Sequence, residues 1–77
     1  MRISKRTREQ AAMICALAAS SDAADYGEAA DAIGASAEAF DLANAAWSAA
    51  NCKFFDGEKG RIGDAKAEAL LRTGWTP

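Results

Sequence analysis

The stretch Thr7-Arg-Glu-Gln-Ala-Ala-Met-Ile-Cys-Ala-Leu-Ala-Ala19 decides the fold class of this 77-residue chain. Thr7 and Gln10 have the spacing of a capping box, so we expect a helix over residues 8–19, with Ser4 as an alternative, earlier cap. A helix without charge on two sides is typical of the centre of a domain. The first side carries Gln10, Met13, Ile14 and Leu17, and the second carries Ala11, Ala12, Cys15 and Ala19.

Alanine occupies 21 positions, and the other apolar residues number only 18. Because alanine has the highest helix propensity and a small side chain, this composition predicts an all-α fold: a compact, alanine-rich bundle of about four helices in a single domain, residues 1–77. The further helices are expected over residues 23–33, 37–51 (extending toward Phe54) and 65–72, the last capped by Asp64. A basic arm (1–7) and a Gly-rich loop (55–63) lie outside them.

The corner between the second and third helices has the most specific local pattern. Gly34 is expected to end one helix in the left-handed conformation, and Ser36 to cap the next. Two interpretations stay open: a helix-turn-helix-like corner or an ordinary glycine corner. The first rests on Ala30, Ile33, Gly34 and Phe40.

The net charge is only −2, but the charges are unevenly distributed. The basic start suits phosphates or an acidic protein surface, and the acidic middle suits a basic partner surface, including one that normally holds nucleic acid. The alternatives are a solvated, frayed start for the basic residues and a solvated helix face for the acidic ones. The candidate partner-binding residues are Arg2, Lys5, Arg6, Arg8, Asp25, Glu28, Asp31, Glu38 and Asp41.

No motif indicates an enzyme, a cofactor or a metal site. The chain has no histidine, and Cys15 and Cys52 lack a CxxC spacing, so we expect two reduced thiols, with a disulfide as the alternative. The acidic residues Asp56, Glu58 and Asp64 do not match the EF-hand pattern. These observations favour a non-enzymatic function.

Phe40, Asn44, Trp47, Asn51 and Phe54 have the 4, 3, 4, 3 spacing of a heptad seam. One interpretation makes Asn44, Trp47 and Asn51 a self-association seam in a homodimer. The favoured alternative packs the ring positions against the helix over 8–19, because two heptads are too few to establish a coiled coil.

The N-terminal region resembles a signal peptide in its basic start and its apolar run, but Glu9 and Gln10 interrupt that pattern. No apolar stretch approaches the ~20 residues of a membrane span. We therefore expect a cytoplasmic protein.

The segments Ile3–Ser20 and Ala67–Pro77, 29 residues together, resemble the ends of small proteins encoded by tailed bacteriophages and prophages. The resemblance implies a bacterial cytoplasmic setting and no particular site. Small phage proteins without enzymatic motifs often bind a host protein, and some disarm host defences such as CRISPR systems.

We therefore expect a non-enzymatic phage protein that binds a host or phage protein. The alternative is a helix-turn-helix-like regulator that holds nucleic acid with its basic arm. Nucleic acid is the less favoured partner, because the second helix of the corner carries Glu38 and Asp41 and no Arg or Lys before Lys53.

Overall fold

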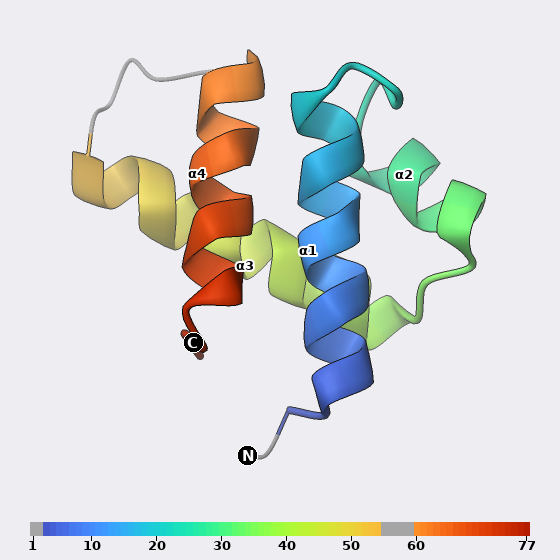
Figure 1. Ribbon diagram of the computed structural model, residues 1–77, viewed down its shortest axis with the longest axis horizontal. Coiled ribbons are helices and arrows are strands. Elements are labelled where there is room, and N and C mark those ends of the chain that lie inside the picture. Colours follow the sequence, from blue (N-terminus) through green and yellow to red (C-terminus); the bar gives the residue numbers. More distant parts are fainter. Residues whose placement is uncertain (1–2, 55–59) are drawn as a thin grey trace.

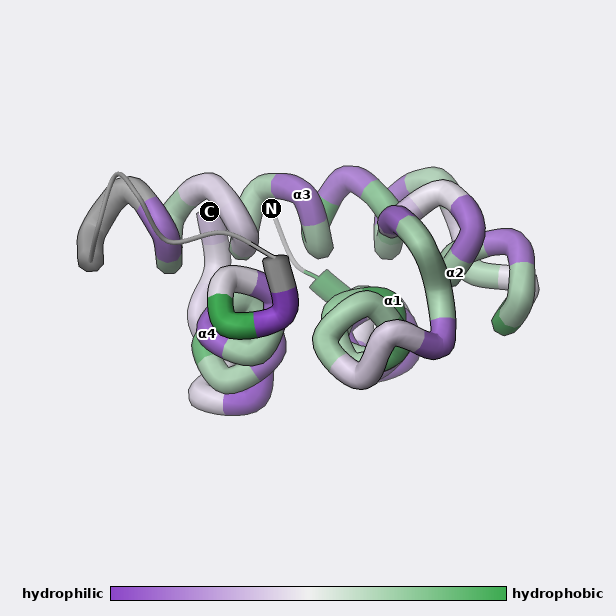
Figure 2. Tube along the Cα trace, turned by 90° about the horizontal axis from the view of Figure 1, so that it is seen from above, coloured by the Kyte–Doolittle hydropathy of each residue, from purple (hydrophilic) through white to green (hydrophobic). Residues whose placement is uncertain are grey.

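The computed structural model describes residues 3–54 and 60–77, with the backbone alone for residues 52–54 and 60. The chain is all-α, as predicted. The described residues form α1 (Lys5–Ala19), α2 (Tyr26–Ile33), α3 (Ala37–Phe54) and α4 (Gly60–Arg72), and none of them lies in a strand. Helices α1 and α4 lie side by side in opposite directions, α3 crosses behind both, and α2 packs beside α1 (Figure 1). Seen from above, α1 and α4 form one layer and α3 a second (Figure 2).

Helices α1 and α3 each contact the other three helices. The prediction of an alanine-lined inner side is correct: the buried residues of α1 are Ala11, Ala12, Ile14, Cys15 and Ala18. The expectation that Met13 belongs to an inner side is wrong, because its side chain is 42% exposed. Two uncharged sides were visible in the sequence, but only the positions of the neighbouring helices decide which residues of each side are covered.

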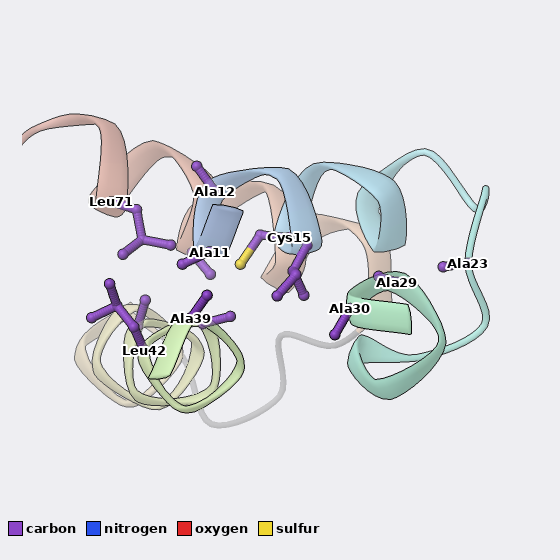
Figure 3. Packing of buried hydrophobic residues seen from close by; sticks show 13 residues of the cluster. Ala11, Ala12, Cys15, Ala23, Ala29, Ala30, Ala39, Leu42 and Leu71 are labelled. Atoms are coloured by element: carbon purple, nitrogen blue, oxygen red, sulfur yellow. The ribbon is translucent and has the colours of Figure 1, made fainter. Parts of the chain in front are cut away.

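The core is built mainly from alanine. Nine of the thirteen residues of the buried cluster are alanines, and the other four are Ile14, Cys15, Leu42 and Leu71. Figure 3 shows Leu71 of α4 pointing toward Leu42 of α3, with the Cys15 thiol between the helices. Small side chains allow the helices to approach closely, so the larger rings of Phe40, Trp47 and Trp75 are only partly buried around the cluster.

Two helix starts differ from the predicted positions. Ser4 caps α1, and its Oγ accepts from the Thr7 amide at 3.1 Å, so the alternative cap is correct and residues 5–7 of the predicted arm are helical. Helix α2 begins three residues later than expected, because Asp25 Oδ1 caps it by accepting from the Glu28 amide at 2.8 Å. Helix α1 ends before Ser21, which adopts φ +66°, a conformation that usually calls for glycine.

The corner between α2 and α3 has the helix terminator and the helix cap that its sequence predicts. Gly34 adopts φ +64°, and its amide donates to carbonyls of the last turn of α2, as expected of a left-handed terminator. Ser36 Oγ accepts from the Ala39 amide at 3.1 Å, so the predicted cap of α3 is correct. The Ser36 amide donates to Gln10 Oε1 at 3.2 Å, which ties the corner to α1.

The Gly-rich loop predicted over residues 55–63 is wrong for residues 60–63, which form the first turn of α4, and residues 55–59 lie outside the described part. Asp64 is therefore inside α4 and is not its cap. The reason lies at Gly63: a Cβ there would sit 2.8 Å from Asn51 Oδ1 and 3.1 Å from Trp47 Nε1. This glycine permits close packing of α4 on α3 rather than a loop.

Candidate protein-binding surface

Five of the predicted partner-binding residues are acidic and exposed: one caps α2, two lie on α2 and two lie on α3. We call them the acidic surface: Asp25, Glu28, Asp31, Glu38 and Asp41. Within the described residues, no ion pair joins any of them to Lys or Arg. Their charges are therefore available to a partner.

Three of these carboxylates also stabilise helix starts of this chain. Asp25 caps α2, and Glu28 Oε1 accepts from the Ala24 amide at 3.2 Å. Glu38 lies in the first turn of α3, where a negative charge favours the helix. Asp31 lies near the C-terminal end of α2, where the helix dipole disfavours a carboxylate. The local structure thus explains Asp25, Glu28 and Glu38, but gives no reason for Asp31 or Asp41.

Glu38 and Asp41 also border a groove between the start of α1 and the side of α3. The groove has a volume of about 470 Å³, within the ~300–1,000 Å³ range of ligand pockets. Its lining combines apolar side chains with two hydroxyls and two carboxylates. The groove is lined by Ile3, Ser4, Thr7, Glu38, Asp41, Leu42, Ala45 and Pro77. Sequence reasoning found its two carboxylates but missed its apolar residues, which come from three distant segments.

Three of the predicted basic residues, Lys5, Arg6 and Arg8, lie at the start of α1, next in sequence to the groove residues Ser4 and Thr7. Lys5 and Arg6 are exposed in its first turn, and Arg2 lies outside the described residues. Cations at a helix N-terminus oppose the helix dipole. Arg8 is partly buried, and its guanidinium donates to the Trp75 carbonyl, so it has a role in holding the C-terminal segment.

The three candidate self-association residues are not on one free surface. Asn44 is exposed, and its Nδ2 donates to the Phe40 carbonyl at 2.9 Å. Trp47 is partly buried against the core. Asn51 is 3% exposed, and its Nδ2 donates to the carbonyls of Trp47 at 2.8 Å and Gly63 at 3.3 Å. Helix α4 of the same chain therefore occupies the end of the seam where Asn51 lies.

A second pocket, of about 290 Å³, is lined by residues of all four helices and of the segment before α2; its lining includes Tyr26, Trp47 and Asp64. The buried Tyr26 hydroxyl lies against Cys15 and Asp64 without a hydrogen bond of good geometry. Burial, and then the Cys15 contact, raises the pKa of Tyr26. Burial also raises the pKa of the unpaired Cys15 thiol to about 11, so it is protonated at neutral pH and a poor nucleophile. The side chain of Cys52 lies outside the described residues.

Within residues 3–51 and 61–77, whose side chains are described, no group of three metal-ligating side chains gathers. Among the described helices, none combines the length and the apolarity needed to cross a membrane. Comparisons with protein-family models, curated proteins and solved structures found no match.

Proposed function

We propose that this chain is a non-enzymatic protein-binding module whose acidic surface contacts a basic surface of a partner protein. The observation that carries the proposal is the state of the acidic surface: all five side chains are exposed, and none is paired with a cation in the described residues. Complementary charge of this kind raises association rates and selects partners.

The resemblance to small phage proteins supplies the proposed setting, the cytoplasm of a bacterium, and a host or phage protein as the partner. A protein that normally holds nucleic acid presents the basic surface that five unpaired carboxylates suit best. Inhibition of a host defence system, such as a CRISPR effector, is the role we favour.

The alternative, a nucleic-acid-binding regulator, is supported less well. In a helix-turn-helix unit the second helix enters the major groove, and here α3 would bring the exposed Glu38 and Asp41 toward phosphates. The remaining cations of the basic start, Lys5 and Arg6, lie on α1, outside the corner. We therefore treat nucleic-acid binding as an outcome of the test.

The test is capture from bacterial lysate with the immobilised chain, in parallel with two charge reversals. Asp31→Lys changes the acidic surface, and Glu9→Lys makes the same change of net charge at an exposed position of α1. We expect the native chain and Glu9→Lys to retain the same protein in stoichiometric amount, and Asp31→Lys to retain at least several-fold less. Absence of a stoichiometric protein at moderate salt contradicts the proposal, and so does nuclease-sensitive capture of nucleic acid alone.

A further inference from the structure

The groove between the start of α1 and the side of α3 combines uncovered apolar surface with two carboxylates. Ile3 and Ala45 are half-buried and Pro77 is exposed, so their apolar atoms face solvent in a groove of about 470 Å³. Glu38 and Asp41 are three residues apart on α3, a spacing that places both carboxylates on the same face of the helix. An apolar group that displaces water from this groove is favoured, provided that the carboxylates stay hydrated or gain a cationic partner.

The charged side chains that line the groove are all negative among the described residues. The nearest cations in the sequence, Lys5 and Arg6, line a different hollow of α1, beside Glu9. Neither Glu38 nor Asp41 forms an ion pair within the described part of the chain. The groove therefore offers two charges that this chain leaves unneutralised, next to apolar surface that it leaves uncovered.

We infer that the groove receives an extended, basic segment of the partner protein, with an apolar side chain against its apolar atoms and cationic side chains beside its two carboxylates. The inference rests on the proposed function, because Glu38 and Asp41 belong to the acidic surface. In an extended segment, side chains two residues apart point to the same side, at a spacing of roughly 7 Å. An apolar residue thus enters the groove while cations two residues away reach the carboxylates.

The two parts of this contact have different roles. Attraction between charges acts over the whole acidic surface and weakens as salt is added. Burial of an apolar side chain is confined to the groove and requires a residue of the right kind at one position of the segment. The groove therefore selects among basic segments that the acidic surface alone would treat alike.

The probe is the peptide Arg-Gly-Leu-Gly-Arg with both ends capped, titrated to about 1 mM and above, the range of weak association. Binding is followed by NMR through the amide signals of Thr7, Asp41, Leu42 and Ala45, which line the groove. Two further peptides separate the features of the probe. Arg-Gly-Ser-Gly-Arg lacks the apolar side chain, and Glu-Gly-Leu-Gly-Glu has the opposite charge.

Two variants change the groove, and each has a matched control. Ala45→Leu fills part of the groove without a change of charge, and Ala16→Leu makes the same substitution at a half-buried alanine of α1 outside it. Asp41→Asn removes one carboxylate of the groove, and Asp31→Asn removes an exposed carboxylate of α2 outside it. Because Asp41→Asn keeps the size of the side chain, it tests the groove independently of how well Ala45→Leu folds.

We expect the leucine peptide to shift these amide signals in the native chain and in both controls. The serine peptide should bind at least several-fold more weakly, and the glutamate peptide should cause no shift. Ala45→Leu and Asp41→Asn should each weaken binding of the leucine peptide several-fold.

Four results would overturn the inference. Equal binding of the leucine and serine peptides would reduce the contact to charge on the open surface, and equal binding of the glutamate peptide would exclude a role for the carboxylates. Shifts of the same signals with chain concentration alone would make a second copy the occupant, and the fourth result is the absence of any shift.

Failure of the proposed function gives a different result, because it is measured by capture from lysate. A native chain that captures a protein, together with a groove that binds none of the peptides, would leave the proposed function standing and refute the role of the groove. A native chain that captures no protein would contradict the proposed function whatever the peptides do.

Discussion

Gly63→Ala should destabilise the protein although alanine is the better helix former. In the interior of a helix, the replacement alone would favour the helix by ~0.5–1 kcal/mol, which is an upper limit for Gly63 in the first turn of α4. The added Cβ, however, would lie 2.8 Å from Asn51 Oδ1, closer than carbon and oxygen can approach without movement. Asn51 has little room to move, since it is 3% exposed and its Nδ2 bonds two carbonyls.

The unfavourable contributions exceed the helix-propensity gain. Inserting a methyl group into a close-packed site costs ~1–3 kcal/mol. Displacing the Asn51 amide from the Gly63 carbonyl removes a further ~0.5–1.5 kcal/mol. We therefore expect the free energy of unfolding to fall by about 1–3 kcal/mol, which for a chain of this length lowers Tm by roughly 10 °C.

Thermal and urea unfolding, followed by circular dichroism, measure this effect. Gly27→Ala is the matched control, because Gly27 is also in the first turn of a helix and its added Cβ would meet only Oδ1 of the exposed cap residue Asp25, at 3.3 Å, a contact that a shift of a few tenths of an ångström relieves. That variant should match or slightly exceed the native stability. Combining Gly63→Ala with Asn51→Ala should give less than the sum of the two losses. A Gly63→Ala protein as stable as the Gly27→Ala control would refute the close approach of α4 to α3.

Three further predictions concern other parts of the fold. Because burial holds the pKa of Cys15 at about 11, above its ordinary 9.0, unfolding releases a proton and the free energy of unfolding should fall above about pH 9, by about 1.4 kcal/mol per unit. Urea titrations at about pH 8 to 10 should show a shallower fall in Cys15→Ala, and an unchanged slope would count against the burial of this thiol. Ser21→Gly should raise the unfolding free energy by up to about 1 kcal/mol, because glycine removes the strain of φ +66°; a lower Tm would be inconsistent with that conformation. Arg8→Ala should speed amide exchange in residues 73–76 by releasing the Trp75 carbonyl, whereas Lys5→Ala, at an exposed neighbour, should not; equal effects would show that the Arg8 contact does not hold the C-terminal segment.

Local signals in the sequence predicted the local features of the fold. Gly34 and Ser36 act on the residues beside them, so the end of α2 and the cap of α3 could be placed before the structure. The alanine-rich side of α1 was also predictable, because helical periodicity and small size suffice to identify it. The start of α2 was placed too early because Ala23 and Ala24 favour a helix, while the Asp25 cap sets the actual boundary.

Features that depend on a distant neighbour could not be predicted in the same way. A glycine at position 63 has the same local signal whether it bends a loop or admits another helix, and only Asn51 of α3 distinguishes the two. The acidic residues were identified from charge alone. The groove beside Glu38 and Asp41 required the start of α1 and Pro77 to meet α3, which no spacing within one segment indicates.

Amide hydrogen exchange on the complex between this chain and the protein it captures is the most direct test of the proposed binding surface. Binding through the acidic surface predicts slower exchange within residues 25–41, which include α2, the Gly34 corner and the start of α3. It predicts no change over residues 64–72 of α4, a helix that does not contact α2. Protection confined to residues 5–10, or none over residues 25–41, would contradict the assignment of the acidic surface as the binding site.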